Sequence, residues 1–279
     1  MLNISEPLVS VNWLNEHINK PNLIVIDATM KKITWEKNEY ENQDIQIKNA
    51  RFLDIKNVFS DTTASFPNTM LSAQEFQEQA RLLGINKDST IIVYDDIGIY
   101  TSPRVWWMFK SMGHDNIAVL DGGLPIWVKA GYTTEKPKKF IGKKGNFIAN
   151  FNQNFFKNYT NVLQAINIGT EILDARSIDR FDGSKPEPRE GLRSGHIPTS
   201  KNIHYNDLLN GTLLKPVDDL KKIFASKLKK EDDIIFSCGS GITACILALG
   251  ATVSGYKKLS VYDGSWTEWG SLSELPIEK

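Results

Sequence analysis

The sequence has few cysteines, few histidines and no excess of charge of either sign. Two cysteines, Cys238 and Cys245, are too few for a disulfide scaffold, and their spacing of seven does not match the usual zinc-ligand spacings. The four histidines are scattered, so we expect no metal site and no cofactor. Thirty-three basic residues balance thirty-three acidic ones, which leaves no overall electrostatic attraction to nucleic acid or to an anionic membrane.

Long hydrophobic runs are also absent. No apolar run approaches the ~18 residues that a membrane-spanning helix needs. The first residues, MLNISEPLVSVNW, contain neither a basic segment nor the long apolar stretch of a signal peptide. We therefore expect a cytoplasmic protein with no membrane partner. The 279 residues suit one large or two ordinary domains, and 41% hydrophobic content is ordinary for a globular chain.

The sequence does contain an internal repeat, which predicts two homologous domains. Four paired signatures occur in the same order, at offsets of 142 to 153 residues. They are Leu23–Ala28 with Glu171–Ala175, Lys48–Ile55 with Lys201–Leu208, Ile91–Asp95 with Ile234–Cys238, and Asp121–Trp127 with Asp263–Trp269. We place one domain at residues 1–135, the other at 159–279, and a lysine-rich linker at 136–158 between them.

Each half is predicted to be α/β. Short β-branched runs at Ile91–Tyr94, Ile117–Leu120, Ile234–Ser237 and Leu259–Tyr262 alternate with helical patterns at Ser72–Leu83 and Val217–Leu228. Strands that alternate with helices form a mostly parallel sheet flanked by helices, and such sheets form their sites beyond the carboxyl ends of the strands.

The most informative stretch is Ile234–Ile246, where a strand runs into Cys238. A Gly-Ser-Gly turn follows, and a helical pattern begins near Thr243. The two glycines let the backbone curl so that N–H groups of residues 239–243 point inward, and the helix dipole adds positive potential. These dipoles favour a thiolate, so Cys238 is a candidate nucleophile. The alternative is a buried, inert cysteine at a strand end.

Other chemistries of such loops are disfavoured. Cysteine phosphatases place an arginine six residues after the cysteine, whereas this chain has Ala244 there. Neither the serine-hydrolase elbow nor the glycine-rich nucleotide loops occur. Cys245 lies among apolar residues of the helical pattern, which indicates core packing, with a redox role as the alternative.

The duplicated layout and the Cys-Gly-Ser-Gly loop resemble the two-domain rhodanese superfamily, and most closely the mercaptopyruvate sulfurtransferases. The similarity covers nearly the whole chain. It rests on the ordered segments Asp174–Ser177, Arg180–Phe181, Glu187–Gly191, Gly195–Pro198, the Cys238 loop and Tyr262–Gly270.

The resemblance implies a sulfur relay. The Cys238 thiolate would take the thiol sulfur of 3-mercaptopyruvate, a small-molecule donor, and become a persulfide while pyruvate leaves. The acceptor would be a thiol such as thioredoxin or glutathione, or cyanide. The backbone N–H groups of the loop would stabilise the anionic sulfur. The loop residues are Gly239, Ser240, Gly241, Ile242 and Thr243.

The resemblance also implies roles for side chains. Arg180 and Arg189 would bind the substrate, because guanidinium groups suit a carboxylate beside a carbonyl. The alternative for both is a surface salt bridge. Arg176 and His196 are expected to be structural, and Ser240 either contacts the substrate or only closes the turn.

Two departures matter. The first half carries Asp95 or Asp96 in the place of Cys238, so it cannot form a persulfide. The family commonly has a histidine, assigned to a proton relay with the loop serine, where this chain has Thr69. Two other functions stay open: a thiosulfate sulfurtransferase, and a non-catalytic module that binds a sulfur carrier. The neutral Gly239 and Ser240 favour mercaptopyruvate, since thiosulfate-preferring relatives carry cationic side chains there.

Overall fold

The computed structural model describes residues 2–30 and 44–279, and its chain divides into two compact units. The first comprises Met1–Asp61, Met70–Asn152 and Gly211–Leu214, and the second comprises Thr62–Thr69, Gln153–Asn210 and Lys215–Lys279. The segment Thr62–Thr69 therefore belongs with the second unit, although it comes from the first half of the sequence.

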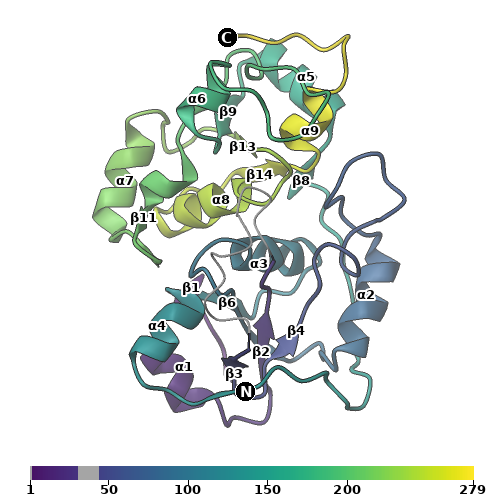
Figure 1. The fold of residues 1–279 in the computed structure, drawn as a ribbon, viewed down its shortest axis with the longest axis vertical. Helices are drawn as coiled ribbons and strands as arrows, with labels where there is room; N and C mark the ends of the chain where they lie inside the picture. The colour runs from purple at the N-terminus through teal and green to yellow at the C-terminus, as the bar shows by residue number, and fades with distance from the viewer. Residues whose placement is uncertain (1, 31–43) are drawn as a thin grey trace. The chain divides into compact units, whose positions relative to one another are not determined.

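The first half of the chain contains short strands and helices in alternation (Figure 1). In order they are β1 (Leu8–Val9), α1 (Val11–His17), β2 (Leu23–Asp27), β3 (Gln46–Ile47), β4 (Arg51–Phe52), α2 (Ala73–Leu82), β5 (Thr90–Tyr94), α3 (Ser102–Ser111), β6 (Ile117–Leu120), α4 (Gly123–Lys129) and β7 (Thr134–Glu135).

The second half repeats the alternation. Its elements are β8 (Phe156–Lys157), α5 (Tyr159–Ile168), β9 (Glu171–Asp174), α6 (Ile178–Phe181), β10 (Lys201–Asn202), the 3-10 helix η1 (Tyr205–Leu208), β11 (Leu209–Asn210), β12 (Leu213–Leu214), α7 (Val217–Ala225), β13 (Ile234–Ser237), α8 (Ala244–Val253), β14 (Leu259–Tyr262) and α9 (Ser265–Trp269).

The two main sheets have the same topology, as the sequence repeat predicts. The first has the order β1-β6-β5-β2-β4 and the second β8-β14-β13-β9-β10, and neighbouring strands in both are parallel. Each strand of one sheet thus has a counterpart in the other. The predicted α/β fold with mostly parallel sheets is confirmed.

Local sequence signals explain the element limits. Three of the four predicted strands match at both limits, and the fourth, β5, begins one residue earlier, at Thr90, and ends as expected. Helix α2 begins after Ser72, which forms a capping box with Glu75. Helix α7 ends at Ala225, three residues before the predicted limit, where the Ser226 hydroxyl donates to the Ile223 carbonyl.

Helix α8 is the most buried helix described in the second half. Its residues from Ala244 to Ala251 are all buried, so it is covered on every side. It packs against β13 and β14 and is contacted by α7. Its amino end is therefore held firmly at the carboxyl end of β13, where Cys238 lies.

The predicted linker, residues 136–158, is partly ordered by packing. Phe147 is 1% exposed, and its ring lies 5.6 Å from that of Phe109 in an edge-on arrangement. The limits of the linker stay a prediction. Across the described residues, no helix is long and apolar enough to cross a membrane.

Candidate active site

The predicted nucleophile lies at the carboxyl end of a central strand. Cys238 directly follows β13, which pairs with β9 on one side and β14 on the other. It is 1% exposed. Helix α8 starts six residues later, at Ala244, so the expected strand-loop-helix arrangement is present.

The carbonyl groups of the loop are held on one side by α9. The Trp266 N–H donates to the Cys238 carbonyl at 2.9 Å. The Gly239 carbonyl accepts from the Thr267 N–H at 2.9 Å and from its hydroxyl at 2.6 Å. With these carbonyls turned toward α9, the peptide N–H groups of the loop are free to face the other way.

Most of the predicted anion-binding N–H groups have no partner within the protein. Among the described residues, the N–H groups of Gly239, Ser240, Ile242 and Thr243 donate to no protein acceptor. The Gly241 N–H differs, because it donates to the Ser265 hydroxyl at 3.2 Å. Gly241 has a φ of +75°, a conformation that favours glycine and turns the chain at this point.

The first unit shows what this type of loop does with an anion. Asp95 follows β5 as Cys238 follows β13, and its carboxylate is completely buried. It accepts from five backbone N–H groups and one hydroxyl, at 2.7 to 3.1 Å, contributed by Ile97, Gly98, Tyr100, Thr101 and Ser102. The repeated loop is thus an anion cradle, and in the first unit Asp95, rather than Asp96, fills it.

Ser265 is a site residue that the sequence reasoning missed. It begins α9 with a φ of +49°, in the left-handed region, and it is fully buried. Its hydroxyl oxygen accepts from the Cys238 N–H at 3.1 Å and lies 3.9 Å from the Cys238 sulfur. The repeat contained a signal for it, because the counterpart in the first half, Gly123, has the same backbone conformation with a φ of +51°.

The two predicted substrate arginines both lie against the loop. A Cβ atom placed on Gly239 would be 3.2 Å from Arg180 Nη2 and 3.9 Å from Arg189 Nη1. Arg180 comes from α6 and Arg189 from the loop that follows it. The structure therefore brings the cysteine loop and both guanidinium groups together.

Arg180 is held in place by a buried charge network. Glu187 accepts from Arg180 Nη2 at 2.5 Å and from Arg176 Nη1 at 2.9 Å. Arg176 also donates to Asp174, at 2.6 Å for the shorter contact, and its guanidinium stacks on Trp266 at 4.3 Å. The charges of these four ionic residues cancel. Arg176 is 2% exposed, as expected for a structural arginine.

The positive charge of Arg180 affects the pKa of two side chains in the second unit. Burial lowers the pKa of His204, and the positive charge of Arg180 lowers it further against the opposing effect of Asp207 and Asp179. Burial raises the pKa of Tyr205, while Arg180 counteracts the rise. Both side chains are therefore expected to be neutral at physiological pH.

The remaining candidate residues contact neighbouring parts of the chain. His196 Nδ1–H donates to the Phe181 carbonyl at 2.9 Å, and the imidazole stacks on the Phe181 ring at 3.8 Å. Cys245 is completely buried inside α8, and its sulfur lies 3.4 Å from the Gly241 carbonyl oxygen. The Thr69 hydroxyl donates to the Phe66 carbonyl at 2.8 Å and so turns back on its own segment.

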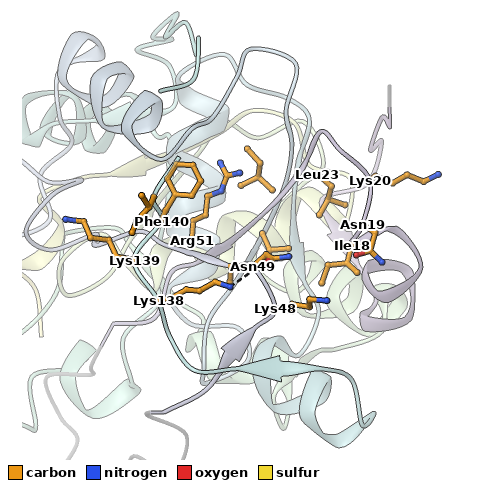
Figure 2. Close-up of a pocket in the computed structure, with 14 residues that line it drawn as sticks. Ile18, Asn19, Lys20, Leu23, Lys48, Asn49, Arg51, Lys138, Lys139 and Phe140 are labelled. Atoms are coloured by element: carbon orange, nitrogen blue, oxygen red, sulfur yellow. Dashed lines mark hydrogen bonds between the residues drawn. The ribbon is translucent and has the colours of Figure 1, made fainter. Parts of the chain in front are cut away.

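A separate cavity lies in the first unit (Figure 2). It has a volume of about 670 Å³ and is lined by the end of α1, by β2 and by the chain after β7. Five of its lining residues are cationic: Lys20, Lys48, Arg51, Lys138 and Lys139. It contains none of the predicted site residues and no nucleophile, so it adds nothing to the chemistry at Cys238.

The comparisons agree with this architecture. The model of the rhodanese-like domain matches twice, over residues 10–130 and 158–272. The chain is 35% identical to the 3-mercaptopyruvate sulfurtransferase of Escherichia coli K12 over 274 residues, which cover 97% of each chain. It is 36% identical to the mitochondrial thiosulfate/3-mercaptopyruvate sulfurtransferase 1 of Arabidopsis thaliana over 299 residues, covering 98% of this chain and 78% of the relative.

A solved structure shows the same fold. The crystal structure of SseA, a 3-mercaptopyruvate sulfotransferase from Escherichia coli, aligns with a TM-score of 0.83 and 32% identity, covering 94% of this chain and 99% of that one. Two parallel α/β units, one with a cysteine loop, define a tandem rhodanese-like protein. The chain belongs to the rhodanese family, and it is an enzyme of the sulfurtransferase class.

Proposed function

We propose that this sulfurtransferase takes its sulfur from 3-mercaptopyruvate and carries it as a persulfide on Cys238. The observation that carries the proposal is the meeting at one strand end of Cys238, two guanidinium groups and a loop whose N–H groups at Gly239, Ser240, Ile242 and Thr243 have no acceptor among the described residues. The names of the relatives from Escherichia coli and Arabidopsis support this choice of donor.

In the first half-reaction, the Cys238 thiolate attacks the thiol sulfur of the donor. The new S–S bond forms as the C–S bond breaks, and the bonding electrons leave with the pyruvyl group as pyruvate enolate, which water protonates. Arg180 and Arg189 hold the carboxylate and carbonyl oxygen through charge-assisted hydrogen bonds. They also stabilise the enolate as negative charge develops on it.

In the second half-reaction, an acceptor thiolate or cyanide attacks the outer sulfur of the persulfide. The S–S bond breaks, and its electrons return to Cys238 as the thiolate. The free N–H groups of the loop, Gly239, Ser240, Ile242 and Thr243, stabilise the anionic sulfur in both half-reactions, as the N–H groups of the first unit stabilise Asp95. The protein thiol thioredoxin, the small thiol glutathione or another thiol would each serve as acceptor.

The experiment is a donor assay with mass spectrometry. Incubation with 3-mercaptopyruvate and no acceptor should release one pyruvate per chain and add a single sulfur, about 32 Da, to the peptide that contains Cys238. Subsequent addition of cyanide should remove the sulfur as thiocyanate. A chain that binds the donor but gains no sulfur would instead be a binding module. Fractionation of the native host would test the expected cytoplasmic location.

A further inference from the structure

An asparagine from the first half of the sequence reaches the cysteine loop. Asn68 Nδ2 donates to the Ser240 carbonyl oxygen at 3.2 Å and to the Ser240 hydroxyl oxygen at 3.2 Å. Asn68 is 7% exposed and Ser240 is 9% exposed. Asn68 lies within the segment Thr62–Thr69, which clusters with the second unit. The contact is therefore internal to the unit that carries Cys238.

The backbone explains why this side chain, and not its neighbour's, meets the loop. Asn68 has a φ of +63°, in the left-handed region that asparagine tolerates better than most residues. The following residue, Thr69, turns its hydroxyl back onto the Phe66 carbonyl. Position 69, where the family has its histidine, is thus not the position that contacts Ser240 here.

The hydrogen-bond chemistry gives the contact a direction. The nitrogen of a carboxamide only donates, so the Ser240 hydroxyl oxygen must accept from Asn68. The hydroxyl hydrogen of Ser240 then points elsewhere, and it donates to no protein acceptor among the described residues. A carboxamide does not take up a proton near neutral pH, so Asn68 cannot pull the hydrogen away from Ser240. This arrangement makes Ser240 a hydrogen-bond donor and not a proton relay.

We propose that Asn68 is a positioning residue that orients the Ser240 hydroxyl as a donor to the pyruvyl oxygen on which negative charge develops. The inference rests on the proposed function, because only a carbonyl-containing donor generates such an enolate oxygen. No proton leaves Ser240 in this step: the S–S bond forms, the C–S bond breaks, and its electron pair leaves with the enolate that Ser240 stabilises.

The test compares Asn68→Asp with Asn68→Gly. Both residues accept the left-handed backbone, so both variants should fold. An ionised carboxylate only accepts, and it would turn the Ser240 hydrogen bond around. We expect kcat/KM for 3-mercaptopyruvate to fall about 100-fold in Asn68→Asp at pH 8 and to recover toward the Asn68→Gly value as acid protonates the carboxyl. Asn68→Gly should lose about tenfold at every pH.

Cys238 lies in this loop, and the guanidinium groups of Arg180 and Arg189 lie next to it. Wild type and variants share all three ionisable groups. A ratio to wild type at the same pH removes the titration that the proteins share, and the pH dependence of Cys238 alkylation in each variant measures any change in the thiol pKa that the new carboxylate causes. A constant ratio for Asn68→Asp across pH 5 to 8.5 would overturn the proposal, because the reversed hydrogen bond would then have no effect on the reaction.

Measuring the two half-reactions separately distinguishes a positioning role of Asn68 from general damage to the loop. Sulfur transfer from the Cys238 persulfide to cyanide forms no enolate, so persulfide-loaded Asn68→Gly should transfer at the wild-type rate. Ser240→Ala should lose about as much in the first half-reaction as the Asn68→Gly/Ser240→Ala double variant. Additive losses, or equal slowing of both half-reactions, would contradict the positioning role. Failure of wild type to form a persulfide from 3-mercaptopyruvate would instead refute the proposed function.

Discussion

At the scale of single residues, the two cysteines of this chain occupy different chemical environments. Cys238 ends a strand beside the N–H groups of its own loop, whereas Cys245 is completely enclosed within α8. Both are buried, so exposure alone does not separate them. The geometry of the surrounding backbone does, because only the first sulfur lies where a developing negative charge is stabilised.

Replacing each cysteine by serine should separate these roles. Cys238→Ser should abolish sulfur transfer, since a hydroxyl forms no persulfide. Cys245→Ser should keep most activity and lose about 1 kcal/mol of stability, because the new hydroxyl can donate to the nearby Gly241 carbonyl. Steady-state rates and the mass of the Cys238 peptide measure the outcome. Activity in Cys238→Ser and none in Cys245→Ser would mean that the nucleophile is misassigned.

The substrate arginines should act on the carboxylate of the donor. Arg189→Ala should remove a charge-assisted contact of about 1.5–3 kcal/mol, or roughly 10- to 150-fold in kcat/KM for 3-mercaptopyruvate. Arg180→Ala should do the same and should also weaken folding, because it leaves Glu187 with one fewer buried partner. Kinetics of purified variants provide the measurement. Unchanged kcat/KM in both would place these arginines in purely structural ion pairs.

At the scale of elements, the strand-loop-helix unit occurs twice, and its two copies have different roles. The first copy places N–H groups around Asp95, and the second leaves the N–H groups of Gly239, Ser240, Ile242 and Thr243 without an acceptor among the described residues. In one copy a carboxylate fills the space permanently, and in the other a reactive sulfur occupies that position. The first loop therefore stabilises its unit, and the second is available for chemistry.

Asp95→Asn should test the stabilising use. The amide offers one acceptor oxygen in place of two and adds a donor that faces the N–H groups, so we expect a loss of about 1.5–3 kcal/mol, the usual cost of losing hydrogen bonds to a buried charged group. Thermal or urea denaturation measures it. Asp88→Asn, at an exposed position of the same unit, is the matched control and should change stability by under about 0.5 kcal/mol. Equal stability of the two variants would show that the carboxylate is not needed.

Glu268, in helix α9, should make the free energy of unfolding depend on pH. Burial raises the pKa of Glu268, and the charge of Asp263 raises it further against the effect of the Tyr262 hydroxyl. An acid whose folded-state pKa is raised contributes stability at low pH that is lost as pH rises through that pKa. Glu268→Gln should therefore be more stable than wild type at pH 8, and the difference should vanish in acid. Denaturation at both pH values measures it, and a difference independent of pH would contradict the assignment.

At the scale of the whole molecule, the distribution of charge indicates which sulfur donor the protein should prefer. The formal net charge is zero, and the buried network around Arg176 and Arg180 is internally neutral as well. Beside the sulfur stand the guanidinium groups of Arg180 and Arg189, the first of which is ion-paired with Glu187, and the peptide dipoles of the loop. That arrangement suits the single carboxylate of 3-mercaptopyruvate better than thiosulfate, which is a dianion and releases sulfite.

We expect kcat/KM for 3-mercaptopyruvate to exceed that for thiosulfate at least about tenfold, a difference of ~1.4 kcal/mol. Glu187→Gln removes the charge that neutralises Arg180, so it should shift the ratio several-fold toward thiosulfate. Steady-state assays of both donors with one acceptor give the ratio. Thiosulfate that equals or exceeds 3-mercaptopyruvate in the wild type would make this chain a thiosulfate sulfurtransferase.

The structure also changes how a donor switch should be designed. The sequence suggests adding cations at Gly239 and Ser240. However, a side chain at Gly239 would meet the guanidinium groups of Arg180 and Arg189. Replacing Ser240 would remove the hydroxyl that accepts from Asn68. A new cation at Gly239 would therefore face like charge at short range. The substitution Glu187→Gln raises the positive charge without adding a side chain to the loop, but it also removes the carboxylate that bridges Arg176 and Arg180.

The sequence by itself determined the duplication, the α/β class, the limits of four central strands to within one residue and the candidate nucleophile. These features depend on local windows: β-branched runs, helical periodicity, caps and a glycine turn between a strand and a helix. Its repeat also placed the first-half counterpart of Cys238 within one residue, at Asp95 or Asp96. Local patterns were enough there because the same chain segment both forms the loop and supplies the group inside it.

Only the tertiary structure decided which distant groups complete the site. Asn68 reaches Ser240 across 172 residues, the Ser265 hydroxyl binds the Cys238 N–H across 27, and Arg180 and Arg189 converge on Gly239. The family resemblance named Arg180 and Arg189, but no local sequence pattern gives these contacts themselves, because each depends on how strand ends and loops pack against one another. The direction of the Asn68–Ser240 hydrogen bond, and with it the donor role of Ser240, follows from that packing and from the chemistry of the amide nitrogen.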